Sequence, residues 1–418
     1  MDFFSYRKGD LYCENIRIRE LVKKYGTPLY IYSKNAIIEK FNRYANAFRS
    51  VPHTICYALK ANSNFRLLKL LAELGSGADI VSAGELFLAL KAGIEPGKIV
   101  YASVGKTDRE IRFALETGIK AFNIESCQEL EVINDIAIGM NTKAPIAIRL
   151  NPDIDIHGHP YISTGKSINK FGIGINEAID VYKRAAAMKG IHVDGVHCHI
   201  GSQIMNLDYF VAAAEKIAVF VKELQKIGIE INHIDIGGGL GANYKSVVKV
   251  NGNEDTQTPE PAQLAERVLD VLHDFNKEIV FEPGRSIIGE AGALISEVLF
   301  RKESNDKKYI IVDAGMNDLI RPSLYNAYHQ IVPLERKEIA EDVVDIVGPI
   351  CETGDFLARD REMPWINRGD FVAIMTAGAY GYSLSSNYNS RPRPAEVWVD
   401  NVEHQLIRSR ENYEDFLA

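Results

Sequence analysis

The sequence predicts an α/β protein in which a closed (β/α)8 TIM barrel is inserted into a second, mostly β domain of sandwich-like or barrel-like form. From about residue 50 to residue 285, eight short β-rich runs alternate with longer segments of helical periodicity. Polar and glycine residues gather where these runs end, as they do at the catalytic face of such barrels. After residue 285, apolar-alternating runs are separated by Gly, Pro and Asp, which is typical of strands without helices.

The eight expected barrel strands are short and rich in β-branched and apolar residues. They are His53–Lys60, Gly77–Ser82, Lys98–Ser103, Ala121–Ser126, Pro145–Asn151, His192–Ile200, His233–Gly239 and Glu278–Glu282. Among the intervening segments, Tyr209–Lys226 has apolar residues at three- and four-residue steps, as one buried helix face requires. An open doubly wound sheet is the alternative fold, but the count of eight favours the closed barrel.

The domain boundaries are expected near residues 36 and 285. Strand-like runs after the barrel include 293–300, 308–313, 343–347, 371–376 and 396–399. The segment Pro28–Ser33 also reads as a strand, although it precedes the barrel. We therefore expect residues 36–284 to form the barrel, and residues 1–35 and 285–418 to form the β domain together. A chain of 418 residues is long enough for two such cores.

The composition excludes several classes of protein. With 46% hydrophobic and 25% charged residues, the chain matches neither disordered nor fibrous proteins. The net charge of -8 is spread along the chain, which argues against nucleic acid and anionic membranes as main partners. No apolar run approaches the roughly 20 residues that cross a bilayer, and the N-terminus lacks a signal pattern, so we expect a cytoplasmic protein. Five scattered cysteines without a Cys-x-x-Cys pair indicate reduced thiols.

The segment Cys56–Asn62 places a lysine, Lys60, at the end of an apolar strand. A lysine at the mouth of a barrel can form an imine with an aldehyde cofactor, because partial desolvation lowers its pKa and frees the amine. Taken alone, the segment fits an exposed lysine after a strand equally well.

Two further segments carry groups that suit such a cofactor. The run His233–Gly241 is a strand that continues into glycines, whose backbone N–H groups can close on a phosphate, although glycines also make plain turns. It lacks the Walker lysine and the spacing of a dinucleotide-binding motif. Glu282 and Arg285 follow the last strand. The carboxylate suits a protonated ring nitrogen and the arginine suits a phosphate or a carboxylate, whereas a surface salt bridge is the alternative.

Histidines and a cysteine complete the set of candidate segments. His197 and His199 lie two residues apart on one strand, so both side chains point the same way. No third metal ligand is evident from the sequence, so no metal is predicted. An imidazole stacked on a cofactor ring, with Ser202 on its phosphate, fits better, and one of the two histidines is expected to be structural. Cys351 can serve as a general acid if it reaches the reacting carbon, whereas a buried inert cysteine is the alternative.

These five segments, taken in their order along the chain, strongly resemble the alanine-racemase-like (fold type III) PLP-dependent decarboxylases. The resemblance runs from about Gly26 to about Arg393, which is nearly the whole chain. It implies pyridoxal 5′-phosphate (PLP) as the cofactor, a PLP-binding barrel and a β domain that completes the active site. Because the dimers of this family complete each site with the cysteine segment of the partner chain, the resemblance also implies an obligate homodimer.

The resemblance assigns roles to individual residues. Lys60 matches the Schiff-base lysine, His199 matches the ring-stacking histidine, and Glu282 matches the partner of the pyridine nitrogen. Cys351 matches the proton donor. The other cofactor contacts that it implies are Asp79, Ser202, Gly238, Gly239, Gly284, Arg285 and Tyr380. The substrate contacts that it implies are Arg285, Arg321, Tyr325, Glu352 and Tyr380.

The expected substrate follows from the charges of these contacts. Meso-2,6-diaminopimelate carries an ammonium and a carboxylate at its far end; Arg321, Arg285 and Tyr325 suit the carboxylate, and Glu352 suits the ammonium. An arginine left unpaired in a closed site would cost several kcal/mol, so substrates without that carboxylate should be rejected. We therefore expect decarboxylation of meso-2,6-diaminopimelate to L-lysine. Decarboxylation of arginine, ornithine or carboxynorspermidine is the alternative.

Two rival functions belong to other classes. Alanine-racemase relatives typically place an arginine near the pyridine nitrogen, because racemisation does not want so strong an electron sink, so Glu282 favours decarboxylation. Non-catalytic PLP-binding proteins are typically a lone barrel. The roughly 130 residues after Arg285, long enough for a further domain and containing Cys351 and Glu352, argue against that class.

Overall fold

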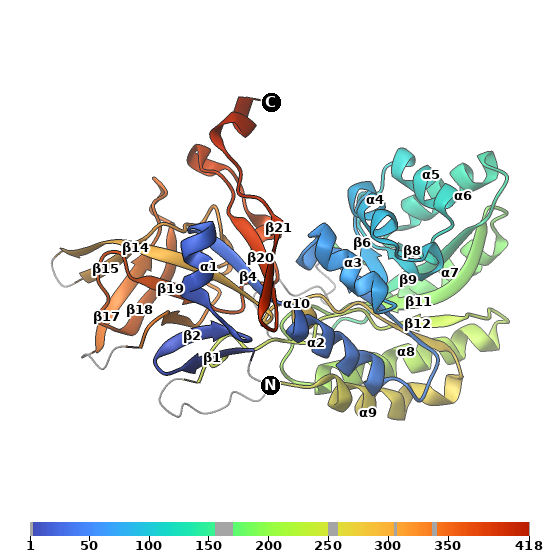
Figure 1. The fold of residues 1–418 in the computed structure, drawn as a ribbon. Coiled ribbons are helices and arrows are strands. Elements are labelled where there is room, and N and C mark those ends of the chain that lie inside the picture. Colours follow the sequence, from blue (N-terminus) through green and yellow to red (C-terminus); the bar gives the residue numbers. More distant parts are fainter. Residues whose placement is uncertain (1–2, 155–169, 250–257, 305–306, 337–340, 418) are drawn as a thin grey trace. The chain divides into compact units, whose positions relative to one another are not determined.

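The computed structural model describes residues 3–154, 170–249, 258–304, 307–336 and 341–417 (Figure 1). Its contacts divide the chain into two compact units. The barrel unit consists of residues 41–241 and 258–286. The β unit consists of residues 1–40, 242–257 and 287–418, so that three separate stretches of the sequence build it.

The barrel unit is a closed ring of eight parallel strands. In order around the ring they are β5 (His53–Ala58), β6 (Gly77–Ile80), β7 (Ile99–Tyr101), β8 (Ala121–Ile124), β9 (Ala144–Asn151), β11 (Ile191–Cys198), β12 (His233–Asp235) and β13 (Glu278–Phe281). A two-residue strand, β10 (Ile173–Gly174), adds to the edge of β9. The ring closes where β13 pairs with β5, with Phe281 opposite Ile55.

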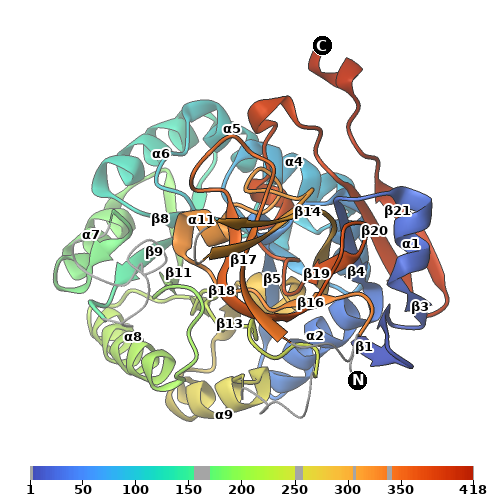
Figure 2. The same cartoon turned by 90° about the vertical axis from the view of Figure 1, so that its left-hand side faces the viewer.

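Helices follow the strands and surround the ring, as Figure 2 shows for α4 to α9. The barrel helices, including α2, which crosses the unit boundary, are α2 (Lys34–Ala47), α3 (Phe65–Glu73), α4 (Ala83–Ala92), α5 (Asp108–Thr117), α6 (Cys127–Gly139), α7 (Ile175–Ala187), α8 (Asp208–Lys226) and α9 (Pro261–Leu272). Several begin at a side-chain cap; in α5, Thr107 and Glu110 form a reciprocal capping box. In α8, Phe210, Ile217 and Val221 are buried and lie on one face, which explains its periodicity.

Buried polar residues distinguish one end of the ring from the other. Asp79, Asn123 and Asp235 lie on β6, β8 and β12, His197 lies on β11, and all four are at most 1% exposed. Side chains that point into a barrel this size are normally apolar packing. At the start of the strands, by contrast, a simple ion pair joins Lys120 to Glu278 at 2.6 Å. The strand C-termini therefore carry two fully buried carboxylates of the barrel, Asp79 and Asp235.

The β unit is built around a nine-stranded sheet. Its main path is β18 (Phe356–Pro364), β17 (Glu341–Val347), β15 (Lys307–Val312), β14 (Gly292–Ser304), β4 (Leu29–Ser33), β20 (Ala395–Asp400) and β21 (Glu403–Arg408); β16 (Ile331–Pro333) and β19 (Phe371–Ile374) pair beside β14. A second sheet consists of β1 (Phe4–Arg7), β2 (Asp10–Cys13) and β3 (Ile16–Arg17), followed by α1 (Ile18–Tyr25). Apolar residues from all three stretches of the sequence, such as Leu21, Val248 and Ile295, share its core.

The predicted fold class is confirmed: a (β/α)8 barrel is joined to a mostly β domain. All eight predicted strands are present, although Lys60 lies outside the strand in which it was expected. The strand β5 ends at Ala58, and Lys60 belongs to a 3-10 turn, Leu59–Ala61. Across the described residues, no helix combines the length and apolarity that a membrane span needs.

Candidate active site

Lys60 lies beside a buried carboxylate at the C-terminal end of the barrel strands. Its Nζ donates a hydrogen bond of 2.6 Å to Oδ2 of Asp79, which is fully buried on β6. Burial, together with the nearby charge of Glu282, raises the pKa of Asp79 to about 7 against the opposing effect of Lys60. The Lys60 side chain remains 37% exposed, so its amine is held by Asp79 and is still accessible to a small molecule.

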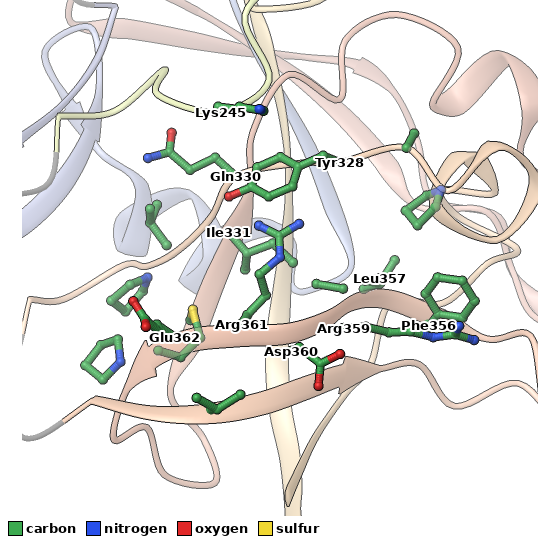
Figure 3. Close-up of a pocket in the computed structure, with 18 of the residues that line it drawn as sticks. Lys245, Tyr328, Gln330, Ile331, Phe356, Leu357, Arg359, Asp360, Arg361 and Glu362 are labelled. Carbon is green, nitrogen blue, oxygen red and sulfur yellow. The ribbon is translucent and has the colours of Figure 1, made fainter. Parts of the chain in front are cut away.

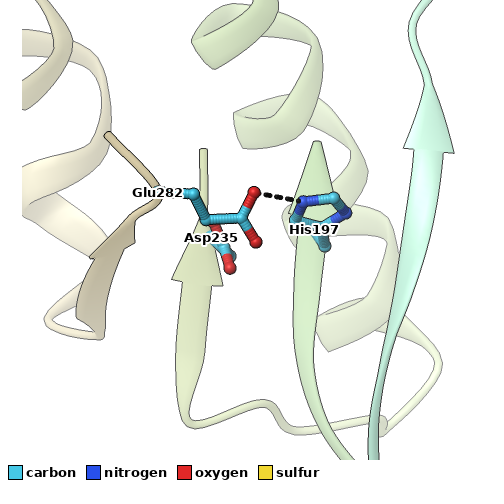
Figure 4. Close-up of side chains that lie close together, drawn as sticks. All are labelled: His197, Asp235 and Glu282. Carbon is cyan, nitrogen blue, oxygen red and sulfur yellow. Dashed lines mark hydrogen bonds and ion pairs between the residues drawn. The ribbon is translucent and has the colours of Figure 1, made fainter. Parts of the chain in front are cut away.

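Glu282 directly follows β13 and is surrounded by hydrogen-bond donors. Asn123 Nδ2 donates to its Oε1 at 3.2 Å, and His197 Nε2 lies 3.3 Å from its Oε2 (Figure 4). Burial by itself raises the pKa of Glu282, but His197 and Lys60 outweigh that effect, and the pKa is held below its usual value. Glu282 is thus a buried carboxylate that keeps its negative charge.

Asp235 is the third member of this cluster and behaves in the opposite way. Its Oδ1 accepts a hydrogen bond of 2.8 Å from the backbone N–H of Gly237. Burial and the charge of Glu282 raise the pKa of Asp235 well above its usual value. Two carboxylates this close do not both ionise easily, so Asp235 retains the proton and Glu282 carries the charge.

The cluster changes one expectation from the sequence. Sequence reasoning saw no third ligand near the two histidines, but one side-chain atom from each of His197, Asp235 and Glu282 lies within 4.8 Å of the others (Figure 4). His199 is not part of this group. The two histidines therefore have different surroundings, although they lie on the same segment. The absence of a metal stays a prediction.

Two loops at the strand ends meet at Ser202 and Gly239. The backbone N–H of Ile204 donates to the carbonyl of Gly239 at 2.9 Å, which joins the loop after β11 to the glycine loop after β12. Arg285 donates from Nη2 to the Ser202 hydroxyl at 2.9 Å. Gly239 has a φ of +115°, and a Cβ there would lie 2.4 Å from the carbonyl oxygen of Gly201, so only glycine fits. Backbone donors, a hydroxyl and a guanidinium together suit an anion such as a phosphate.

His199 packs against the same glycine loop. The backbone N–H of Gly238 donates to His199 Nδ1 at 3.2 Å, and a Cβ on Gly237 would approach that atom to 2.8 Å. Burial, assisted by the charges of Arg149 and Lys60, lowers the pKa of His199 well below its usual value. The ring is therefore neutral and flat, as a group that stacks on an aromatic cofactor needs to be.

The barrel site fits a phosphorylated pyridine aldehyde. It offers an amine at Lys60, an ionised carboxylate at Glu282 and an anion-binding group of Ser202, Gly239 and Arg285. Two buried polar atoms at the same strand ends, Oδ1 of Asp79 and Oδ1 of Asn123, have no hydrogen-bond partner among the described residues. Buried polar atoms are seldom left unpaired unless a ligand or water satisfies them, which supports a polar ligand at this position.

In the β unit, two predicted site residues share the short helix α11 (Arg321–Tyr325). Arg321 is 6% exposed, and its guanidinium donates to His329 at 2.9 Å. Tyr325 ends the helix and is half-buried. Pro322 occupies the first turn, where its missing N–H costs no hydrogen bond.

The loop that carries Cys351 and Glu352 is anchored at its base and exposed at its tip. Asp355 accepts hydrogen bonds from the backbone N–H groups of Ile350 at 2.7 Å and Met316 at 2.6 Å. Cys351 is exposed, unlike Cys198 in the barrel, whose pKa burial raises to about 12. The predicted alternative of a buried inert cysteine at position 351 is therefore wrong.

Tyr380 lies in the segment that follows β19 and has a strained backbone. Its φ is +56°, in the left-handed region that a bulky residue rarely adopts. Such strain often marks a side chain that the surrounding structure holds in one direction.

The β unit also contains a large pocket of about 1270 Å³ (Figure 3). Its lining includes basic and aromatic side chains, and the Arg361 guanidinium stacks on the Tyr328 ring at 3.4 Å from the centroid. Pro322 lines it, but none of the predicted site residues does. The pocket is thus separate from the residues that the sequence singled out.

The structure brings together the predicted residues of the barrel unit and adds several that sequence reasoning missed. Lys60 and Asp79 are in contact, as are Ser202 and Arg285, and Gly284 packs so closely on the turn of Lys60 that a Cβ would lie 2.9 Å from Ala61. The missed residues are Asn123, Arg149, Asp235 and, in the β unit, His329. For the first three, a polar residue near the end of an apolar strand was the available signal.

Comparison with known proteins gives consistent matches. The family model described as "Pyridoxal-dependent decarboxylase, pyridoxal binding domain" matches residues 34–289. The chain is 52% identical over 412 residues to a diaminopimelate decarboxylase of Aquifex aeolicus, covering 99% of this chain and 96% of the relative. It is similar to the crystal structure of diaminopimelate decarboxylase from Helicobacter pylori complexed with L-lysine, with a TM-score of 0.90, 43% identity and coverage of 96% and 98%. The M. jannaschii enzyme, also with L-lysine, has a TM-score of 0.93, 39% identity and coverage of 100% and 97%.

Proposed function

This chain belongs to the diaminopimelate decarboxylases, within the pyridoxal-dependent decarboxylase family, and we propose that it converts meso-2,6-diaminopimelate to L-lysine and CO2. The observation that carries the reaction type is the ionised, hydrogen-bonded carboxylate of Glu282 at the same strand ends as the Lys60 amine. The cofactor of the family is PLP, and the groups of the barrel unit match its parts. The proposed reaction is the last step that makes lysine.

In this proposal the Lys60 amine would hold PLP at its aldehyde carbon. Ser202, Gly238, Gly239 and Arg285 would bind the phosphate, because the Ser202 hydroxyl lies 2.9 Å from the Arg285 guanidinium and the glycine loop leaves room for an anion beside them. Asp79 holds the Lys60 amine, and Gly284 allows the turn of Lys60 to pack closely. We assign His199 to the face of the ring, because its neutral imidazole is flat and fixed by Gly238.

Glu282 determines the type of reaction. When bound, PLP supplies a pyridine ring that takes up the electron pair left at Cα as CO2 departs. A negative charge next to the ring nitrogen favours its protonated, more electron-withdrawing form. Glu282 can do this because Asn123 and His197 keep it ionised inside the barrel. Racemisation gains nothing from so strong an electron sink, so this carboxylate favours decarboxylation.

The β unit supplies the groups for the far end of the substrate. Arg321 and Tyr325, with Tyr380, bind the carboxylate there, and Glu352 binds the ammonium. Arg285 contacts Ser202 at 2.9 Å, which favours a position near the phosphate over a direct substrate contact. Ornithine and arginine lack the far-end carboxylate and would leave the Arg321 charge without its ligand, at a cost of several kcal/mol.

Cys351 returns the proton to Cα after CO2 has left. Its exposed position on an anchored loop suits a residue that serves the active site of a second copy, as the family's shared sites require. We therefore propose a homodimer in which each chain lends Cys351 and Glu352 to its partner. The cytoplasmic location and the absence of a nucleic-acid partner remain predictions.

The test is a decarboxylation assay with the purified protein and PLP. We expect CO2 release from meso-2,6-diaminopimelate with L-lysine as the product, and release from ornithine and arginine that is slower by at least on the order of 10³-fold. Chiral analysis of the unreacted amino acid checks the racemase alternative. Turnover of ornithine or arginine without turnover of diaminopimelate would refute the assignment.

A further inference from the structure

Arg321 is held by His329, a residue to which no role has been assigned. The His329 ring is fully buried, with its Nε2 2.9 Å from Nη1 of Arg321 and its Nδ1 2.7 Å from the carbonyl oxygen of Met375. A guanidinium can only donate, so Nε2 of His329 must accept. The proton therefore sits on Nδ1 and is donated to Met375. The two contacts fix both the tautomer and the neutral state of the ring.

Tyr244 completes the support of Arg321. The guanidinium carbon lies 4.6 Å from the centroid of the Tyr244 ring, in a cation–π contact. The same ring meets His329 edge to face, at 5.1 Å and 87°. The backbone joins the two segments as well, because the N–H of Gln330, next to His329, donates to the carbonyl of Tyr244 at 2.8 Å. Arg321 thus rests against two rings that are themselves fixed.

His329 and Tyr244 are both uncharged, so they hold Arg321 without neutralising its charge. An arginine side chain has several rotatable bonds, so pointing it in one direction costs entropy that fixed partners reduce. An aspartate or glutamate at position 329 would also fix it, but would neutralise its charge and compete with an anionic ligand. A neutral acceptor orients the guanidinium and leaves its charge available for a carboxylate.

We propose that His329 is a positioning residue that aims Arg321 at the far-end carboxylate of the substrate, and that it thereby sets the preference for substrates that carry this carboxylate. The inference rests on the proposed role of Arg321 in substrate binding. It adds a residue that touches neither the substrate nor the cofactor but determines how strongly the carboxylate is bound.

The experiment compares two ligands that differ only in this carboxylate. L-lysine, the product, retains the far-end ammonium and carboxylate of diaminopimelate, whereas cadaverine is L-lysine without the carboxylate. Inhibition constants of both are measured on the PLP-loaded enzyme for the wild type, His329→Leu, His329→Gln and His329→Glu. Glutamine retains a neutral acceptor near the position of Nε2, and glutamate retains an acceptor but adds a negative charge. Visible absorbance of the bound cofactor and the Tm are recorded for each variant.

We expect His329→Leu to weaken inhibition by L-lysine by at least about tenfold, as the loss of a hydrogen bond to a charged group predicts, and to leave cadaverine within about twofold. The KM for diaminopimelate should rise with little change in kcat. His329→Gln should remain close to wild type, and His329→Glu should weaken L-lysine at least as much as the leucine variant. The glutamine and glutamate variants preserve a polar partner for Arg321, so they test the inference even if the leucine variant does not fold.

Equal weakening of both ligands would overturn the inference, because it would indicate general damage to the site. Unchanged binding of L-lysine in the leucine and glutamate variants would overturn it too. Failure of the proposed function looks different: the wild type itself would neither decarboxylate diaminopimelate nor be inhibited by L-lysine.

Discussion

The two units of this chain hold their site residues in opposite ways. In the barrel unit, Glu282, Asp235 and His197 lie on or directly after the neighbouring strands β13, β12 and β11, Asn123 lies on β8 across the ring, and all four are at most 5% exposed. In the β unit, Cys351 and Glu352 lie on an exposed loop whose backbone is held by Asp355 at its base and by Asn389, whose Oδ1 accepts from the backbone N–H of Cys351 at 2.8 Å. Sites on strands are held more rigidly than sites on loops.

The difference suggests a division of labour. A buried charge keeps its strength only in fixed surroundings of low polarity, so the carboxylate that serves the cofactor ring belongs inside the barrel. The proposed proton donor, Cys351, and the proposed ammonium-binding acid, Glu352, would have to meet a substrate that enters and leaves, so an exposed loop suits them. Changes in the barrel should therefore affect the chemistry that the whole family shares, and changes in the loop should affect the rate of single steps and the choice of substrate.

The largest effect is expected from Lys60→Ala. Removing the amine proposed to bind the cofactor should lower kcat by at least on the order of 10⁴-fold and abolish the visible absorbance band of the loaded enzyme. The matched control is Lys120→Ala, which removes a lysine of the same barrel that is paired with Glu278 at the opposite strand ends. Both variants are measured by absorbance and CO2 release. A visible band that survives in Lys60→Ala would remove this lysine from its proposed role.

Glu282→Gln should have the next largest effect. The amide is nearly isosteric but uncharged, so it no longer favours a protonated ring, and we expect kcat to fall by about 10²–10³-fold while PLP still binds. Glu278→Gln is the control, because it alters a carboxylate at the start of the same strand. If the two variants lose similar activity, the charge of Glu282 is not what matters.

Cys351→Ala tests the loop half of the comparison. Loss of a general acid commonly costs about 10²-fold, so kcat should fall by this order while the absorbance of bound PLP stays as in wild type. Cys127→Ala, on helix α6, should change neither kcat nor the absorbance of bound PLP. A mixture of Cys351→Ala and Lys60→Ala chains should regain part of the activity, because a shared site would pair one intact Lys60 with one intact Cys351. No recovery in the mixture would contradict the proposed sharing.

Asp235→Asn should have a smaller effect, on how the free energy of unfolding depends on pH, and the pKa of Asp235 determines the sign of that effect. The folded pKa of Asp235 lies above its unfolded value of about 3.9, so its contribution to stability is complete below that pH and is lost as the pH rises toward the folded pKa. Wild type should therefore lose about 1 kcal/mol per pH unit, relative to Asp235→Asn, as the pH rises above about 4. Urea unfolding of the PLP-free protein between pH 4.5 and 8 measures this difference.

Asp194 provides the control with the opposite sign. Burial raises its pKa, but His233 and Asn232 outweigh that effect and lower it to about 2. Its stabilising contribution is thus present above an unfolded value of about 3.9 and is lost as the pH falls toward 2. Asp194→Asn should therefore be less stable than wild type across the whole range. If the difference in free energy of unfolding between wild type and Asp235→Asn did not change with pH, the raised pKa of Asp235 would be contradicted.

Much of the fold could be predicted from the sequence, because each barrel strand is a short apolar run whose period is local. The motifs also singled out Lys60 and Glu282 as candidates, since their type and position near strand ends are visible without a structure. What could not be predicted is which polar side chains meet across the ring. Asn123 looks like an ordinary strand residue until closure of the barrel places it 3.2 Å from Glu282.

The β unit was harder to predict for a related reason. His329 has no motif of its own, and its importance follows only from its contacts with Arg321, Met375 and Tyr244. Tyr244 follows the glycine loop of the barrel in sequence, yet its contacts lie within the β unit. A periodic pattern in the sequence predicts local secondary structure. It does not predict that a residue following a barrel loop packs in the β unit.

The pairing of β13 with β5 closes the barrel, and it has a consequence for the order of folding. Lys60 follows the first strand of the ring and Glu282 follows the last, so the amine and the carboxylate become neighbours only after nearly the whole barrel sequence has been made and paired. Contacts of such high sequence separation form late. A ligand that needs both groups binds the finished ring and not its partly assembled forms, and it pulls the folding equilibrium toward closure by mass action. We thus expect the cofactor to stabilise the barrel once β13 has paired with β5, before it takes part in any turnover.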